Sequence, residues 1–184
     1  MTAAVQRDGE AQRALLAGDR DAARRAFADA AELYRQSWEV APRTAYGRLV
    51  GMLKSSTLAG GGSSEAAYVL AALPDADPQS ATASYARALA ALIMGLDEDA
   101  QVWAVRMSAG GDAFVRTAEA IAALAGHAGP RFEAALEGIV RDFERRAEHL
   151  TGVAIADTAL MLEVLAARRG VAVAIESPVL PALR

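Results

Sequence analysis

Glycine recurs at similar intervals along this chain, each time between two alanine-rich apolar stretches. The first example is "LLAGDRDAARRAF" at 15–27, in which a polar turn follows the glycine. Similar stretches are "TLAGGGSSEAAYVL" from Thr57, "LIMGLDEDAQVWAV" from Leu92 and "ALAGHAGPRFEAAL" from Ala123. Because glycine tolerates the positive φ found just past a helix end, each glycine predicts that one helix ends and another begins. The repetition therefore predicts a succession of helical hairpins.

Capping residues divide the chain into about nine helices. Aspartate and serine are favoured at N-caps and proline in the first helical turn, which marks Asp19, Pro42, Ser63 or Ser64, Asp77 with Pro78, Asp97, Asp112 and Pro130 as starts. The expected helices cover about 3–17, 20–40, 43–59, 64–73, 78–94, 97–109, 112–125, 130–150 and 157–170. Since short loops make consecutive helices neighbours, we expect an all-α fold, an antiparallel helix-pair array within one domain, 1–184.

The last stretch, "GVAVAIESPVLPALR" at 170–184, departs from the helical pattern. It alternates weakly, is β-branched and contains two prolines, which favours an extended backbone. We expect 171–184 to form an extended tail packed on the helices through Val171, Val173, Ile175 and Leu180. A frayed terminus is the alternative.

The spacing of the marker glycines resembles that of tetratricopeptide-like repeats. Gly18, Gly61, Gly95 and Gly126 are separated by 43, 34 and 31 residues, and a helix–turn–helix repeat of that family has about 34. After Gly18, the residues Ala23, Phe27 and Ala30 follow the family's small–bulky–small pattern. The resemblance covers about residues 3–145, and it implies a divergent array of stacked helix pairs.

A second resemblance lies at the C-terminus, where a helix ends in glycine and "ESPVLP" follows. This resembles the Imm49-like group of bacterial polymorphic-toxin immunity proteins, which are all-helical and common in actinobacteria. The alanine-rich chain, with Lys54 as its single lysine, has the composition of such GC-rich genomes. The resemblance implies a protein that neutralises a toxin by binding it, and it assigns no particular residue.

Composition argues against several functional classes. The chain has no cysteine, which excludes disulfides, thiolate metal sites and cysteine nucleophiles. Its net charge of −4 argues against a general nucleic-acid binder. Because no apolar run approaches about 18 residues, we expect no membrane span and a cytoplasmic protein.

No catalytic or cofactor motif is evident in the sequence. It contains no Ser–His–Asp order, no metalloprotease motif and no phosphate-binding glycine loop. His127 lies in a turn and is expected to be solvated. Glu144, Glu148 and His149 could in principle hold a divalent metal, but the adjacent arginines favour a salt-bridged helix surface. We therefore expect no enzyme activity, no metal and no cofactor.

Asp157 is the one charge in an otherwise apolar span, 150–162. It could be the N-cap of the last helix. Alternatively, it could form a buried ion pair with an arginine such as Arg87, Arg116 or Arg145.

Tyrosine, tryptophan and arginine dominate binding hot spots, so these residue types mark a candidate surface for a protein partner. The candidates are Tyr46, Tyr85, Trp103, Arg106 and Arg116. Tyr85 is also in helical phase with Leu89 and Leu92, which would place it in the core. We expect a non-enzymatic protein-interaction module, in its most specific form a toxin-neutralising protein. The alternative is a small-molecule or effector-binding sensor with a pocket between helices five to nine.

Overall fold

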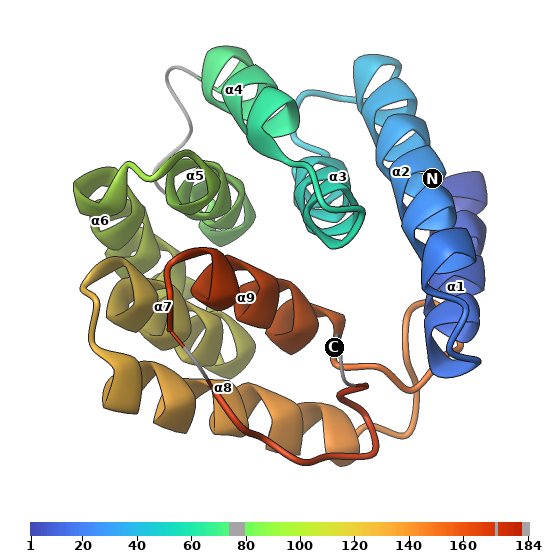
Figure 1. The fold of residues 1–184 in the computed structure, drawn as a ribbon. Helices are drawn as coiled ribbons and strands as arrows, with labels where there is room; N and C mark the ends of the chain where they lie inside the picture. Colours follow the sequence, from blue (N-terminus) through green and yellow to red (C-terminus); the bar gives the residue numbers. More distant parts are fainter. Residues whose placement is uncertain (74–79, 172, 182–184) are drawn as a thin grey trace.

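The protein is all-α, as the sequence predicts. The computed structural model describes residues 1–73, 80–171 and 173–181, and within these it contains nine α-helices, a 3-10 turn and no strand (Figure 1). The helices are α1 (Thr2–Leu16), α2 (Arg20–Glu39), α3 (Gly47–Leu58), α4 (Ser63–Ala72), α5 (Ala81–Met94), α6 (Asp97–Met107), α7 (Asp112–Ala125), α8 (Gly129–Glu144) and α9 (Asp157–Arg168). None of these helices has the length and apolar character needed to cross a membrane.

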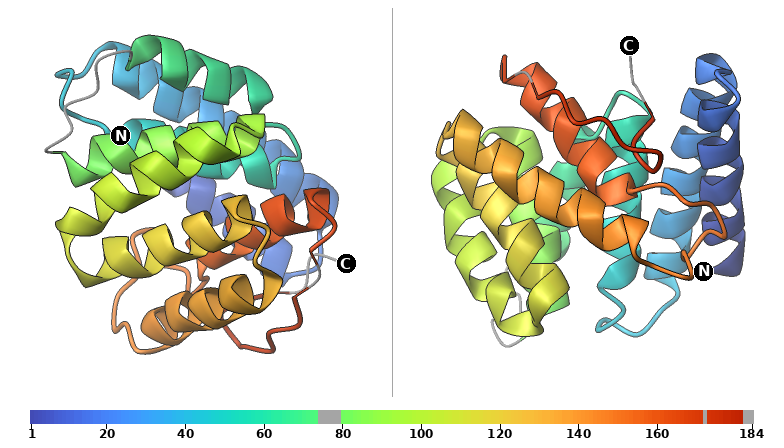
Figure 2. Two further views of the ribbon diagram at one scale, coloured as in Figure 1. Left: turned by 90° about the vertical axis from the view of Figure 1, so that its left-hand side faces the viewer. Right: turned by 90° about the horizontal axis from the view of Figure 1, so that it is seen from below.

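Consecutive helices pack on one another at both ends of the chain. In the N-terminal part α1 contacts α2 and α2 contacts α3, through a buried stripe on α2 that includes Phe27, Tyr34 and Trp38. These positions recur at helical spacing, so that one face of α2 points to the core. In the C-terminal part α5, α6, α7 and α8 lie one beside the next (Figure 2, left).

The last helix joins these two groups. The apolar helix α9 contacts α3, α7 and α8, and it lies in the middle of the molecule (Figure 1). Its Leu160, Leu162 and Leu165 are almost fully buried. A second link is the contact between α3 and α5. One continuous apolar core therefore runs through both groups of helices.

Several helix ends agree with the capping signals in the sequence. The carboxylate of Asp19 accepts a hydrogen bond from the backbone N–H of Ala22, as expected of an N-cap. Gly95 ends α5 in the left-handed conformation, and Gly18 follows α1 with a φ of 80°. Glycine tolerates these values because it has no Cβ.

Other helix starts differ from the expectation. Helix α3 begins at Gly47 rather than near 43, because Pro42 instead opens a turn in which the Ala45 N–H donates to the Pro42 carbonyl at 2.9 Å. Glycines rather than Ser63, Ser64 and Asp112 are the N-caps of α4 and α7. The predicted start at Asp77 and Pro78 lies outside the described residues, and Ser80 caps α5.

Helix α8 is shorter than predicted. It ends at Glu144, where the N–H groups of Arg145 and Arg146 donate to carbonyls three residues back and tighten the last turn. Residues 145–156 then form a loop. The hydroxyl of Thr151 in this loop donates to Gln12 on α1 at 2.5 Å, a tertiary contact that a continued helix would not make.

The segment after Gly170 contains neither helix nor strand where the structure describes it. Val179 and Leu180 are buried, and the carbonyl of Val179 accepts a 2.7 Å hydrogen bond from the N–H of Ala156. Val171, Val173 and Ile175 are partly buried against the core. The segment thus contacts the helices, while its extended conformation stays a prediction.

Candidate functional site

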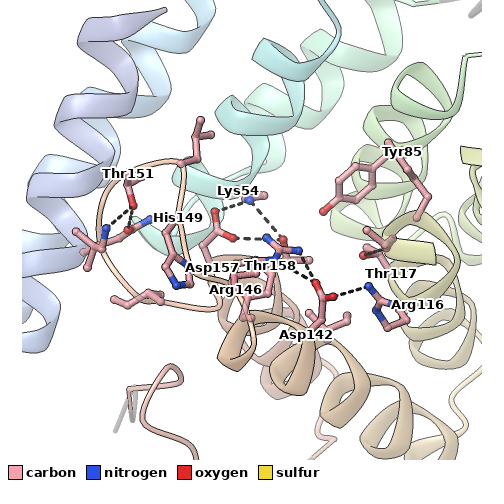
Figure 3. Close-up of a pocket in the computed structure, with 18 residues that line it drawn as sticks. Lys54, Tyr85, Arg116, Thr117, Asp142, Arg146, His149, Thr151, Asp157 and Thr158 are labelled. Atoms are coloured by element: carbon pink, nitrogen blue, oxygen red, sulfur yellow. Dashed lines mark hydrogen bonds and ion pairs between the residues drawn. The ribbon is translucent and has the colours of Figure 1, made fainter. Parts of the chain in front are cut away.

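A cavity of about 230 Å³ lies among α1, α3, α5, α7, α8, α9 and the 145–156 loop (Figure 3). Its apolar wall includes Phe114, Ile139, Phe143, Leu150, Val153 and Ile155. Its polar lining comprises Gln12, Lys54, Tyr85, Arg116, Thr117, Asp142, Arg146, His149, Thr151, Asp157 and Thr158. Small-molecule sites typically combine apolar walls with convergent polar groups, and both kinds of residue line this cavity.

An ion pair between α3 and α9 lines the cavity (Figure 3). The ammonium of Lys54 lies 2.5 Å from a carboxylate oxygen of Asp157, and both side chains are less than a fifth exposed. Lys54 also lies 3.4 Å from the hydroxyl of Thr158. Packing of α3 against α9 brings these side chains together although they are far apart in the sequence.

This geometry decides between the two expectations for Asp157. The N-cap of α9 is Ala156, and no side chain caps the helix, so Asp157 is not the cap. Asp157 forms an ion pair, but its partner is Lys54 rather than Arg87, Arg116 or Arg145. Of these three, Arg116 pairs with Asp142 instead. At the first position of α9 the carboxylate also interacts favourably with the helix dipole.

The ammonium of Lys54 keeps its charge at neutral pH. Burial disfavours the ammonium form of Lys54, but the carboxylates of Asp157 and Asp8 outweigh this effect and raise its pKa above the ordinary value. Each partner therefore compensates the charge of the other in a poorly solvated place. Removal of Lys54 would leave the charge of Asp157 unbalanced.

Asp8 lies behind this pair and does not line the cavity. Its carboxylate is 3.5 Å from the Tyr34 hydroxyl and 3.4 Å from the Ser55 hydroxyl, and the residue is only 6% exposed. Burial raises the pKa of Asp8 to about 6, because a carboxylate loses hydration there, and Lys54 offsets part of this effect.

Two arginines of the lining share one carboxylate (Figure 3). Arg116 of α7 lies 2.7 Å from one oxygen of Asp142, and Arg146 lies 2.5 Å from the other oxygen. The Arg146 guanidinium also stacks over Phe143, 3.8 Å from the ring centroid, and Phe143 stacks with His149. These three charged side chains are 30–39% exposed, so they form the solvent side of the cavity.

Two buried polar atoms, on residues that line the cavity, have no hydrogen-bond partner in the described part of the chain. They are the hydroxyl oxygen of Tyr85 and Nδ1 of His149. Burial raises the pKa of Tyr85, so its hydroxyl keeps its proton at neutral pH and can both donate and accept. Buried polar atoms nearly always have partners, so these two are candidates to contact a bound molecule.

The five candidates for a partner surface do not form one face. Tyr85 and Arg116 line the cavity. Trp103 lies between the guanidinium groups of Arg87 and Arg106, each 4.4 Å from its ring centroid. Tyr46 lies elsewhere, at the start of α3, with its ring 6.1 Å from that of Trp38.

Neither histidine belongs to a cluster suited to a metal. Within the described residues, no group of three or more histidine, aspartate or glutamate side chains gathers in one place. Glu144 accepts a 2.7 Å hydrogen bond from Ser177, whereas His149 stacks on Phe143. His127 is two-thirds exposed and lies 3.2 Å from Asp97.

Sequence reasoning missed Asp142, Phe143 and Arg146. Asp142 and Arg146 are four residues apart in a stretch that the sequence predicts as helical, and this spacing was a usable local signal for an ion pair. The contribution of Arg116 from another helix has no such signal. No protein family, curated protein sequence or solved structure shows a significant match to this chain.

Proposed function

We propose that this chain binds a small organic molecule in the cavity between α3, α5, α7, α8 and α9. The observation that carries the proposal is the convergence of two ion-paired clusters and two unpartnered polar atoms on one apolar-walled cavity. Its volume of 230 Å³ corresponds to about eight water molecules of liquid, which suits a metabolite of one ring or a short chain. In this role the chain is a sensor or carrier rather than a catalyst.

The test is a binding screen with small organic fragments that include anions, neutral molecules and cations. Ligand-observed NMR detects binding to the wild-type protein. Ala113→Trp should abolish it, because Ala113 lines the cavity and is itself exposed, so that the added ring fills the mouth without disturbing the core. Glu119→Trp, on the same helix but outside the cavity, is the matched control. Fragments that bind Ala113→Trp as well as wild type would contradict the proposal.

A second candidate function is binding of another protein. It is favoured by the Trp103 side chain between Arg87 and Arg106, next to Val102 and Val105, which are 49% and 72% exposed. Tryptophan and arginine are frequent anchors in interfaces. In this proposal α5 to α8 act as an antiparallel, tetratricopeptide-like array of helix pairs, and neutralisation of a toxin is the most specific version.

Affinity capture with the purified chain tests this second function. The double variant Trp103→Ala/Arg106→Ala should lose the captured protein, whereas Arg141→Ala, on the exposed face of α8, should retain it. Equal capture by the double variant and wild type would exclude this surface.

A further inference from the structure

We infer that the molecule bound in the cavity is a small organic anion, with an aromatic or apolar body, whose anionic group contacts Arg116 and Arg146. This inference rests on the proposed ligand-binding function and names the chemical class of the ligand. It follows from the charges that face the cavity, the donors that remain unused and the side chains next to them.

The charges lining the cavity leave one positive charge at its solvent side. The described lining contains three cations, Lys54, Arg116 and Arg146, and two carboxylates, those of Asp142 and Asp157. Asp157 is compensated by Lys54, at 2.5 Å. Asp142 is the single carboxylate between two guanidinium groups. An anion at that position would restore the balance, whereas a cation would meet two arginines.

Both guanidinium groups have N–H groups that do not contact Asp142. Arg116 contacts Asp142 through Nη2 only, and Arg146 contacts it through Nε and Nη2. A guanidinium carries five N–H groups, so each arginine retains N–H groups that can donate to a further oxygen. Carboxylate and phosphate oxygens fit such planar donors well. Arg116 comes from α7 and Arg146 from the loop that follows α8, and Asp142 holds them close together.

The surroundings of the arginines favour an apolar or aromatic body. Phe143 lies directly under the Arg146 guanidinium, and Phe114 and Ile139 belong to the adjoining wall. A ring bound against these side chains would bury apolar surface while its acidic group remained at the solvent side.

The surroundings of Lys54 disfavour an anion. Lys54 is already paired with Asp157, and Asp8 is close to it, so two carboxylates lie near this one ammonium. An additional negative charge there would be repelled. Neutral polar side chains, among them those of Tyr85, Thr117 and Thr158, also line the cavity and suit the uncharged part of a ligand. The ligand should therefore bind with its charge toward Arg116 and Arg146.

Three probes of similar size and different charge test the inference: phenylacetate, phenylacetamide and phenethylamine. Titration calorimetry or NMR should show that phenylacetate binds wild type at least about tenfold more tightly than phenylacetamide, as expected for hydrogen bonds to charged groups. Arg116→Gln and Arg146→Gln should each weaken phenylacetate binding about tenfold and change phenylacetamide binding little. Arg141→Gln, the same substitution at a surface ion pair of α8, should change neither.

The ratio of phenylacetate to phenylacetamide affinity separates a loss of recognition from a loss of folding, because a misfolded variant would lose both probes. If phenylacetamide or phenethylamine binds wild type as tightly as phenylacetate, and Ala113→Trp blocks that binding, the anion inference is wrong and the proposed function stands. An unchanged ratio in Arg116→Gln and Arg146→Gln would also overturn the inference. If none of the probes binds, the inference fails, and the wider fragment screen decides the proposed function separately.

Discussion

Lys54 and Asp157 show how one contact can link elements that are distant in the sequence. Their pair connects the middle of α3 to the first turn of α9, and it is shielded from solvent on most sides. Such a pair contributes less to net stability than its short distance suggests, because both groups lose hydration. The loss of one partner is costly, because the remaining charge is still poorly solvated.

We predict that Lys54→Met and Asp157→Asn each lower the free energy of unfolding by about 2–3 kcal/mol. The double variant should lose less than the sum of the two, because the unpaired charge is then absent. Urea unfolding of the four proteins measures this coupling. Arg141→Gln removes an exposed pair with Glu137 and should cost no more than about 0.5 kcal/mol. Strictly additive losses would show that Lys54 and Asp157 do not interact.

The raised pKa of the buried Asp8 carboxyl predicts that the free energy of unfolding depends on pH. Burial raises its pKa from the ordinary value of 3.8 to about 6, so the native state retains a proton that the unfolded chain has released. Its contribution is therefore unfavourable above about pH 6, and it disappears below about pH 4. Burial is the main cause of this raised pKa; the charge of Asp157 adds to it, whereas Lys54 and the hydroxyls of Ser55 and Tyr34 oppose it.

Asp8→Asn removes this titration. Relative to wild type, the variant should gain about 2–3 kcal/mol of unfolding free energy as the pH rises from about 4 to about 8. Urea unfolding of both proteins at several pH values measures how the difference between their unfolding free energies changes with pH. A difference that is the same at every pH does not affect this test. Parallel pH profiles for the two proteins would show that Asp8 titrates normally.

At the scale of helices, the packing of α2 on α3 depends on a glycine. A Cβ built on Gly51 would lie 2.7 Å from ring carbons of Tyr34, which is 2% exposed. The missing side chain lets the ring lie against α3, with its hydroxyl near Asp8. Alanine normally favours a helix over glycine by about 1 kcal/mol, but here it would force two packed helices apart.

We therefore predict that Gly51→Ala destabilises the protein by about 1–3 kcal/mol, against the helix propensity of alanine. Gly47→Ala is the matched control in the same helix, because no atom lies within 4 Å of the Cβ that it would add. It should be neutral or slightly stabilising. Thermal unfolding of both variants measures the contrast, and a stabilised Gly51→Ala would contradict the close approach.

Local signals in the sequence predict the helices better than they predict the site. Asp19 and Gly95 carry their own capping chemistry, so their helix ends could be predicted. The end of α8 could not, because the 145–156 loop is fixed by a contact between Thr151 and Gln12. The choice of Lys54 as the partner of Asp157 depends likewise on how α3 and α9 pack. Tertiary contacts therefore decide the features that build the cavity.

At the scale of the molecule, α9 makes the two groups of helices one body. It packs on α3 from the first group and on α7 and α8 from the second. The guanidinium of Arg169, just past its end, donates to the Leu92 carbonyl at the end of α5 and to Asp97 on α6. The cavity lies where these groups meet, so its shape depends on their relative position, and a bound molecule would stabilise that position.

This arrangement predicts that both groups unfold in one transition. The two tryptophans report on them separately, since Trp38 is buried in α2 and Trp103 lies on α6. In Trp103→Phe the fluorescence follows the N-terminal helices, and in Trp38→Phe it follows the C-terminal ones. In each variant the fluorescence and far-UV circular dichroism should give the same urea midpoint, because a shared core prevents either group from unfolding alone. If the midpoints differ within one variant, α9 does not couple the two groups, and the cavity between them would not hold a fixed shape.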